Sequence, residues 1–274
     1  MKIYLFGSNG MLGNYMKLYL SRKYDLIPIT RQDYDLENLS RNGLNELLEK
    51  KGINEGDLVI NCVGIIPQTV SGINIKKTYY KINSLFPVIL GEIVRSKNCK
   101  FIHVTTDCVF SGKNRNEIYN EFSTPDETND YGTSKSLGEL CFGTIIRTSI
   151  IGEELFHKKS LLEWVKSNNG NTINGYVNHY WNGVTCLQMG KIVDEIIEKN
   201  LYWDGVKHIY SPEVVSKYEL VGKIVNIYGL DIEVKKMETD VVDKSIGSVY
   251  ESLFEIPNLD KQIEEMRDFG KLFF

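Results

Sequence analysis

The sequence predicts an α/β protein built on a doubly wound parallel sheet, with a smaller C-terminal portion packed against it. Up to residue 152, short apolar runs typical of buried strands alternate with amphipathic segments typical of helices. A glycine-rich turn directly follows the first apolar run. Strands separated by helices in this rhythm are joined by right-handed crossovers, so we expect a parallel sheet with helices on both faces.

Each element of this α/β region has its own signal. The apolar runs predict five strands, at residues 2–6, 25–30, 57–64, 100–106 and 143–152. Helices are expected at 11–23, 44–52 and 76–96, and from Asp130 onward. Gly52 is well placed to end its helix, because glycine readily adopts the left-handed conformation of a C-terminal cap. Pro87 predicts a kink or a restart within 76–96.

The composition of the chain changes after residue 152. Helix-like segments at 158–170, 187–199 and 217–229 accompany a stretch at 172–185 that is rich in Asn, Tyr and Trp. No linker rich in Pro or Ser separates this part from the first. We therefore predict a dinucleotide-binding portion at 1–152 and a smaller α/β cap at 153–274, which packs on the sheet edge and returns some segments to the sheet.

The bulk composition excludes several functional classes. The 274 residues are 42% hydrophobic and 25% charged, as in ordinary globular proteins. A net charge of −4 argues against nucleic acid as the main partner, because a phosphate-binding face usually needs a basic excess. No apolar run approaches the roughly 18 residues of a membrane span, and the first strand is too short for a secretory leader. Scattered cysteines and histidines predict reduced thiols, no metal and a cytoplasmic location.

The turn "GSNGMLG" is a candidate nucleotide-binding loop. Gly7 ends the first strand, and Gly10 and Gly13 open the first helix. Glycines there would let backbone amides approach a pyrophosphate, which the helix N-terminus also stabilises. The spacing is G-x-x-G-x-x-G rather than G-x-G-x-x-G, so the motif alone fits a structural turn equally well. Its position in an alternating strand–helix chain favours a Rossmann-type dinucleotide site.

The end of the second strand carries information about the cofactor. A site that prefers NAD usually has Asp or Glu there, to accept hydrogen bonds from the ribose hydroxyls. Here Thr30 and Arg31 occupy the corresponding positions. A guanidinium suits a 2′-phosphate and cannot accept hydrogen bonds from a diol. We therefore expect NADP(H) as the preferred cofactor and NAD(H) as the second option, unless Arg31 is only a surface residue.

Three further residues predict proton-transfer chemistry. Tyr131 and Lys135 are four residues apart, so on a helix they share one face. A neighbouring ammonium should lower the tyrosine pKa, which would let Tyr131 exchange a proton with a sugar or alcohol oxygen. Thr106 ends the fourth strand and should face the same crevice, where it can hydrogen-bond the reacting oxygen.

With these motifs the chain resembles the extended short-chain dehydrogenases/reductases, and within them the dTDP-4-dehydrorhamnose reductases. The strand-end motif of that family appears as "TTDCVFSG" (105–112), its helix as "YGTSKSLGE" (131–139), and its following strand as "IIRTSIIG" (145–152). "VINCVG" (59–64) and Asn83 also match. The resemblance covers about 1–152 well and weakens beyond it. It implies NADPH-dependent reduction of a 4-keto sugar nucleotide, in the synthesis of rhamnose-like or surface-polysaccharide sugars.

The resemblance also implies roles for individual residues. Tyr131 would be the general acid, Lys135 would hold the nicotinamide ribose, and Thr106 would orient the carbonyl. Asn83 would maintain the active site. The other cofactor-binding residues would be Gly7, Asn9, Gly10, Met11, Leu12, Gly13, Arg31, Asp35, Leu36, Val63, Gly64, Ile65, Thr105, Arg147 and Thr148. The partner would be the nucleotide sugar, with no nucleic acid or membrane, and a homodimer is one assembly that the resemblance allows.

The departures from the family fall on the sugar side. Cys108 stands where the family usually has tyrosine, "IIPQT" (65–69) replaces an Ala-Tyr-Thr pattern, and "NHYWNGVT" (178–185) replaces the usual substrate loop. Because of these departures, the resemblance does not identify the sugar of the substrate. Trp181 serves equally well as a core residue or as a sugar contact. The substrate-binding candidates are Pro67, Thr106, Asp107, Cys108, Ser149, Asn178, Trp181 and Asn182.

Two alternative functions are compatible with the same scaffold. A sugar-nucleotide epimerase or dehydratase would usually prefer NAD, and a dehydratase typically needs an Asp-Glu pair after the strand-end threonine. Arg31 argues against an NAD-preferring epimerase, and the sequence Asp107-Cys108 argues against a dehydratase, because the Asp-Glu pair is missing. A non-catalytic, NADP-binding regulatory subunit would tend to lose Tyr131 or Lys135, and this chain retains both.

Overall fold

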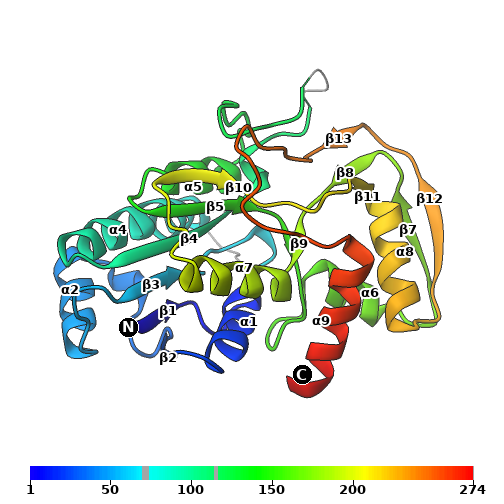
Figure 1. Cartoon of the computed structure of the whole chain (residues 1–274). Coiled ribbons are helices and arrows are strands. Elements are labelled where there is room, and N and C mark those ends of the chain that lie inside the picture. The colour runs from blue at the N-terminus through cyan, green and yellow to red at the C-terminus, as the bar shows by residue number, and fades with distance from the viewer. Residues whose placement is uncertain (70–73, 114–116, 274) are drawn as a thin grey trace.

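A six-stranded parallel sheet forms the centre of the molecule (Figure 1). The computed structural model describes residues 1–69, 74–113 and 117–273. The sheet has the order β10-β5-β4-β3-β1-β2. Its strands are β1 (Lys2–Phe6), β2 (Asp25–Ile29), β3 (Leu58–Asn61), β4 (Lys100–Thr106), β5 (Thr144–Thr148) and β10 (Gly205–His208). The predicted α/β class is confirmed, and four of the five predicted strands are present with ends shifted by at most three residues. The fifth, predicted at 143–152, is divided into β5 and β6 (Ile150–Ile151), and β6 belongs to a separate two-stranded sheet.

The strand order reverses at β1, which pairs with β2 on one side and β3 on the other. At such a reversal the loops leave the carboxyl ends of the strands in opposite directions, and a crevice opens between them. The glycine turn follows β1 here. The fold therefore places the turn at the point where open α/β sheets bind ligands.

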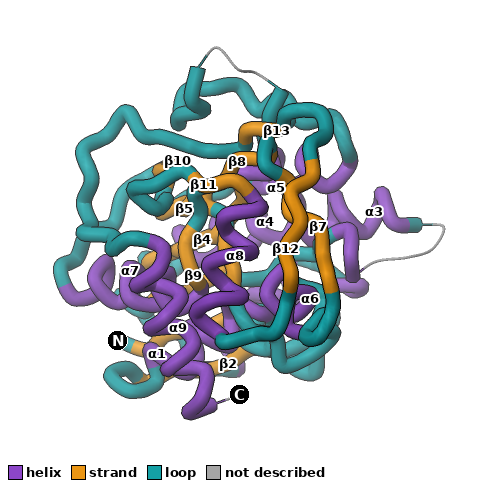
Figure 2. The backbone as a smooth tube through the Cα atoms, turned by 90° about the vertical axis from the view of Figure 1, so that its right-hand side faces the viewer, coloured by secondary structure: helices purple, strands orange, loops and turns teal. Residues whose placement is uncertain are grey.

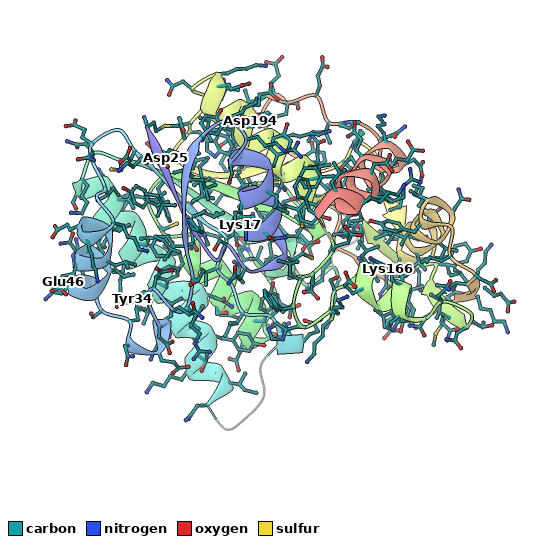
Figure 3. All side chains as sticks on the ribbon, turned by 90° about the horizontal axis from the view of Figure 1, so that it is seen from below. Lys17, Asp25, Tyr34, Glu46, Lys166 and Asp194 are labelled. Carbon is teal, nitrogen blue, oxygen red and sulfur yellow. The ribbon has the colours of Figure 1, made fainter. Side chains whose placement is uncertain are left out.

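Helices cover both faces of the sheet because alternate strand residues point to opposite sides. Ile3 and Leu5 of β1 join the core under α1 (Met11–Leu20) and α7 (Cys186–Glu198). Tyr4 and Phe6 join a second core with α2 (Arg41–Lys50) and α4 (Phe86–Ser96). Asp194 of α7, labelled in Figure 3, accepts hydrogen bonds from the chain just after α1 and ties these two helices together.

The long helical stretch before β4 is interrupted by a π-helical turn. It consists of α3 (Ile75–Tyr79), the π-turn η3 (Tyr80–Leu85) and α4. Pro87 lies in the first turn of α4, where a missing N–H costs little. The predicted restart at this proline is confirmed, and the wider turn before it contains Asn83. Such π-turns inside helices are frequent at functional sites.

The C-terminal portion adds small sheets and helices beside the main sheet (Figure 2). Segment 172–185 forms β7 (Thr172–Tyr176), β8 (His179–Trp181) and β9 (Val184–Thr185). The other strands are β6 (Ile150–Ile151), β11 (Val215–Ser216), β12 (Glu233–Met237) and β13 (Val242–Asp243). The helices are α5 (Asp130–Gly138) in the first part, then α6 (Leu161–Ser167), α8 (Lys217–Tyr228) and α9 (Leu259–Phe273).

Two elements of this portion were not predicted: β10 is too short to show a period, whereas α9 does repeat apolar residues at helical spacing, at Leu259, Ile263 and Met266. β10 returns to the main sheet and pairs in parallel with β5, and α9 packs on α7 and α8. Short 3-10 turns complete the chain at η1 (Leu36–Asn38), η2 (Pro67–Thr69) and η4 (Asp107–Val109). Within the described ranges, none of the helices combines the length and the apolar character needed to cross a membrane.

Candidate active site

The glycine turn has the geometry of an anion-binding loop. Gly7 has φ +78°, a left-handed conformation that favours glycine. A Cβ on Gly13 would lie 2.0 Å from the Gly7 carbonyl oxygen, so the helix can approach the strand only because Gly13 has no side chain. Gly10 caps α1 without a side-chain hydrogen bond, and the first turn of α1 has no acidic residue. The first amides of α1 are thus free to bind an anion.

The residues around this turn fit a dinucleotide. The buried Ser8 hydroxyl and the Asn14 amide nitrogen have no hydrogen-bond partner within the part of the chain that the structure describes. Asn9 is exposed beside them, Met11 is half-buried, and Leu12 points into the core, so Leu12 can offer only its backbone. Free amides, missing side chains and unpaired polar groups together suit a bound pyrophosphate.

The candidate adenosine side lies at the end of β2. The Arg31 side chain is 77% exposed, and its guanidinium lies 3.3 Å from Asp35 Oδ2. Asp35 caps η1 by accepting a hydrogen bond from the Glu37 amide, and Leu36 packs partly against the core. An exposed guanidinium that has only a weak surface ion pair remains available to a phosphate.

Asn83 links the end of β3 to the catalytic helix. Its side chain accepts a hydrogen bond from the Ile65 amide (3.0 Å) and donates to the Ile65 carbonyl (3.1 Å) and to Ser134 Oγ (3.1 Å). A Cβ on Gly64 would lie 3.5 Å from Lys135 Nζ, so this strand end borders the lysine ammonium. Val63 is half-buried at the same strand end. The π-turn that carries Asn83 therefore positions both the loop and α5.

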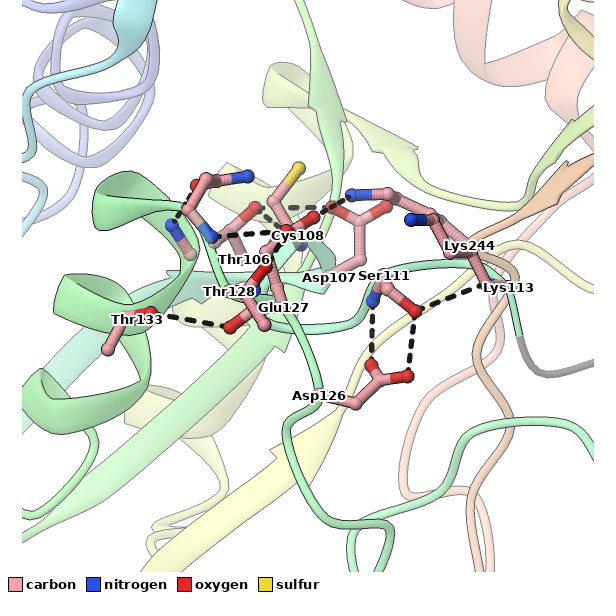
Figure 4. Close-up of polar contacts among 12 residues, drawn as sticks. Thr106, Asp107, Cys108, Ser111, Lys113, Asp126, Glu127, Thr128, Thr133 and Lys244 are labelled. Atoms are coloured by element: carbon pink, nitrogen blue, oxygen red, sulfur yellow. Dashed lines mark hydrogen bonds and ion pairs between the residues drawn. The ribbon is translucent and has the colours of Figure 1, made fainter. Parts of the chain in front are cut away.

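Thr106, Tyr131 and Lys135 come together at the carboxyl end of β4. Thr106 Oγ1 donates to Asp107 Oδ1 (3.2 Å) and accepts from the Cys108 amide, as Figure 4 shows. The nearby Thr106 hydroxyl lowers the Tyr131 pKa, against the larger effect of burial, which raises it. Lys135 is buried, its ammonium donates to the Val104 carbonyl (3.4 Å), and burial lowers its pKa to about 8.

The expected lowering of the Tyr131 pKa by Lys135 is wrong for this structure. Burial raises the Tyr131 pKa, the Cys108 thiol and the Asp107 carboxyl add to the rise, and Thr106 opposes it. The reason is that Lys135 is directed to the carbonyl of Val104, while desolvation penalises the phenolate. Tyr131 thus holds its proton firmly, as a proton donor must before reaction.

The Arg147 guanidinium belongs to a buried hydrogen-bonding network, and its expected cofactor contact stays a prediction. Its side chain is buried, donates to both Glu139 carboxylate oxygens, and donates a further hydrogen bond to His208 Nε2 (2.9 Å). Its guanidinium also lies 5.0 Å from the Phe110 ring centroid. His208 Nδ1 in turn donates to the Gly247 carbonyl (2.7 Å). The guanidinium uses its hydrogen-bond donors within this network. The network connects Glu139, at the C-terminal cap of α5, to β5 and to His208 of β10.

Two asparagines expected to contact the sugar are occupied by backbone groups instead. Asn178 donates to the Thr239 carbonyl and accepts from the Thr239 amide. Asn182 donates to the Ile246 carbonyl (2.8 Å) and accepts from the Ile246 amide (3.0 Å). Each amide side chain pairs with both backbone groups of one residue in a distant segment. They hold the C-terminal segments in place, and the expected sugar contact of these two side chains stays a prediction.

The remaining candidates are distributed around the same strand ends. Thr105 is buried with an unpaired hydroxyl, Thr148 is buried and donates to the Ser149 carbonyl, and Pro67 is exposed in η2. Trp181 is 3% exposed, and a Cβ on Gly183 would clash with both its ring and the Ser149 carbonyl. Trp181 therefore packs against the end of β5 and forms part of the wall beside the site.

The sequence offered no signal for three charged residues near Asp107. Lys217 begins α8, Lys244 follows β13, and Glu127 precedes α5. Lys244 Nζ lies 3.5 Å from Glu127 Oε2, and Figure 4 shows this pair beside Asp107. Lys217 and Lys244 both lower the pKa of buried Asp107, against the larger effect of burial, which raises it. Only the folded chain brings these three segments to the carboxyl end of β4.

Comparison with known protein families identifies the family of this chain. A family model described as the RmlD substrate binding domain matches residues 1–172. The chain belongs to this family. The matched region includes the glycine turn after β1, the strand β4 that ends at Thr106, and the helix α5 that carries Tyr131. No curated protein sequence matches the chain.

Solved structures share the fold of this RmlD-family chain over its whole length. A dTDP-4-dehydrorhamnose reductase from Clostridium acetobutylicum has a TM-score of 0.78 and 21% identity, with 99% of this chain and 100% of that chain covered. One from Bacillus anthracis, in complex with NADP, has a TM-score of 0.81 and 20% identity, with coverage of 98% and 99%. A hypothetical one from Sulfolobus tokodaii has a TM-score of 0.75 and 25% identity, with coverage of 95% and 98%.

Proposed function

We propose that the protein is an NADPH-dependent reductase of a nucleotide-activated 4-keto sugar. The observation that carries this proposal is the meeting of Thr106, Tyr131 and Lys135 at the carboxyl end of β4, in a fold whose glycine turn fits a dinucleotide. Membership of the RmlD family and the names of the similar structures support the same substrate class. Residues 1–152 would hold the cofactor, and 153–274 would form the sugar side.

The proposed chemistry divides the work between the cofactor and the chain. When bound, the reduced nicotinamide supplies the hydride for the ketone carbon. Tyr131 donates a proton to the oxygen as negative charge develops on it. Thr106 turns its single O–H from Asp107 to the same oxygen and fixes it by a hydrogen bond. The Lys135 ammonium lies at the same strand end, where it would hold the nicotinamide ribose of the bound cofactor. Asn83 bonds both Ile65 and Ser134, and it thereby fixes the position of Lys135 relative to the end of β3.

The geometry around β2 supports NADPH rather than NADH as the preferred cofactor. Arg31 is exposed and free to turn from Asp35 to a 2′-phosphate, which would offer it a stronger, charge-assisted contact. Asp35 then remains beside the adenosine, where a carboxylate can still accept from a ribose hydroxyl, so NADH is a weaker second cofactor. The five free cysteines suit a reducing compartment, and we propose the cytoplasm.

The direct test is turnover with a panel of 4-keto-sugar nucleotides. The protein is mixed with NADPH and each ketone, and the loss of nicotinamide absorbance is followed. We expect oxidation of NADPH with at least one ketone and loss of turnover by about 10²-fold or more in Tyr131→Phe, since proton transfer contributes that much. NADPH binding should be unchanged in the variant. Turnover in Tyr131→Phe at the parent rate would refute the proposed role.

A further inference from the structure

Two polar side chains pair inside the apolar core on one face of the main sheet. Asn61 ends β3 and His103 lies in β4, where the two residues stand directly opposite each other in the parallel register. They are 0% and 1% exposed, and the Asn61 amide nitrogen lies 3.1 Å from His103 Nδ1. The residues two positions earlier on each strand, Val59 and Phe101, belong to the core with α2 and α4. A buried polar pair in such surroundings is costly unless its hydrogen bonds are made.

The second hydrogen bond of Asn61 fixes which way its amide points. Its Oδ1 accepts from the Val63 backbone N–H at 2.9 Å, so its nitrogen is the atom that faces His103. His103 Nδ1 must therefore accept, and in a neutral imidazole the proton is then on Nε2. A proton on Nδ1 would need an acceptor from Asn61, and turning the amide to supply one would break the bond to Val63. Burial and the nearby Lys135 lower the His103 pKa well below its ordinary value, in agreement with a neutral ring.

The peptide that this pair holds lies against the glycine turn. A Cβ on Gly7 would lie 2.9 Å from the Val63 nitrogen, so the turn and the end of β3 are in direct contact. The next residue of the same strand end borders Lys135, because a Cβ on Gly64 would lie 3.5 Å from the lysine Nζ. Asn61 thus fixes a strand end that touches two parts of the candidate cofactor site.

The imidazole of His103 carries a polar atom that the core does not satisfy. Its Nε2 is buried and has no hydrogen-bond partner within residues 1–69, 74–113 and 117–273. A buried donor left unpaired costs stability, and an apolar pair of similar shape would avoid that cost. Asn61 and His103 are therefore better explained by the peptide that they hold than by what they add to the core.

We propose that Asn61 and His103 are positioning residues for the cofactor, which together hold the strand end 62–65 beside the glycine turn, where it would border the nicotinamide ribose. Both side chains are too deeply buried to touch a ligand themselves. His103 acts only through Asn61, and Asn61 acts through the Val63 amide. The effect is the same for NADPH and NADH, since these differ only in the phosphate expected beside Arg31. This inference rests on the proposed function and adds two residues to the determinants of cofactor affinity.

The test separates cofactor affinity from stability. The double variant Asn61→Leu, His103→Leu removes both partners, so no amide or imidazole is left unpaired, and urea denaturation should find it as stable as the parent. Fluorescence titration should find the Kd for NADPH and for NADH raised by about tenfold each, the loss expected when one hydrogen bond that orders a binding segment is removed. His103→Leu alone should raise both Kd values similarly. His103→Asn, which has an acceptor at the same distance along its side chain as Nδ1, should restore them.

Thr144→Val is the matched control for the loss of a buried polar contact. Thr144 is 1% exposed, and its hydroxyl donates to the Trp203 carbonyl (2.7 Å) and accepts from the Trp203 amide (3.1 Å). It begins β5, at the opposite end of the strand from the candidate site. This variant should lower the stability of the protein and leave both Kd values unchanged.

The outcomes distinguish this inference from the proposed reaction, because binding is measured without turnover. Weaker binding of both cofactors by the double variant, in a protein that reduces no ketone, would support the positioning pair and overturn the reductase. Unchanged Kd values in the double variant, or a loss confined to NADPH, would overturn the inference. A double variant that does not fold would overturn it as well, because the pair would then be required by the core itself.

Discussion

The close contact between Gly13 and the Gly7 carbonyl makes Gly13→Ala a sharp test of how the glycine turn contributes to stability and to cofactor binding. A Cβ at Gly13 would lie 2.0 Å from the Gly7 carbonyl oxygen, 2.7 Å from its carbonyl carbon and 3.0 Å from Ser8 Cα. All three neighbours are backbone atoms, so no side-chain rotation relieves the overlap. The first turn of α1 must move away from β1 by about 1 Å to bring the shortest contact to 3.0 Å.

This movement should reduce both the stability of the fold and the affinity for the cofactor. Forcing an extra carbon into a packed site costs about 1–3 kcal/mol. The same displacement carries the first amides of α1 away from the pyrophosphate position, and each ~1.4 kcal/mol lost there is a tenfold increase in Kd. We expect Gly13→Ala to lower the free energy of unfolding by about 2 kcal/mol and to weaken NADPH binding by at least about tenfold.

A matched glycine in the same chain provides the control. Gly222 lies inside α8, and a Cβ added there would meet no atom within 4 Å, so Gly222→Ala should stabilise the protein by roughly 0.5–1 kcal/mol. Urea denaturation measures both stabilities, and fluorescence titration measures the Kd for NADPH. A Gly13→Ala protein as stable as the parent, with an unchanged Kd, would refute the role assigned to this contact.

The remaining predictions concern the cofactor phosphate and a buried histidine. Arg31→Ala should raise the Kd for NADPH by about tenfold while leaving that for NADH nearly unchanged, as a lost charged hydrogen bond of ~1.5 kcal/mol predicts; equal losses would contradict the phosphate contact. Burial and the nearby Arg147 lower the pKa of His208 from 6.5 to about 4. The unfolded chain therefore binds more protons between these values, so stability should fall by about 3 kcal/mol as pH drops from 6.5 to 4. Urea denaturation across this range checks the slope, which His208→Gln should flatten; an equal slope in both proteins would exclude His208 as its source.

Local patterns were sufficient to predict the fold class and the candidate residues Thr106, Tyr131 and Lys135. The strand–turn–helix at Gly7 to Gly13 and the Tyr131–Lys135 spacing are both short-range signals, so each can be recognised without knowing its neighbours. The strand end at Thr106 follows from the same alternation. The structure brings these segments together because parallel strands place all their carboxyl ends on one edge of the sheet.

The contacts that the sequence did not predict join residues that are distant in sequence. Asn182 pairs with Ile246, 64 positions away, and Arg147 with His208, 61 positions away. No local pattern announces such pairs. β10 was missed because four residues, "GVKH", are too few to show a period. Lys217 is recognisable in the sequence only as a helix start, and its place beside the Trp181 ring depends on how the C-terminal portion folds back.

Because β10 returns to the main sheet, we expect the two portions of the chain to fold as one unit. A chain cut after residue 152 would leave β5 as an open sheet edge and would remove His208, one of the hydrogen-bonding partners of the buried guanidinium of Arg147. An exposed edge and a partly unpaired buried charge both favour aggregation or unfolding over a stable fragment. We therefore expect the two portions to melt in a single transition, even though one is assigned to the cofactor and the other to the sugar.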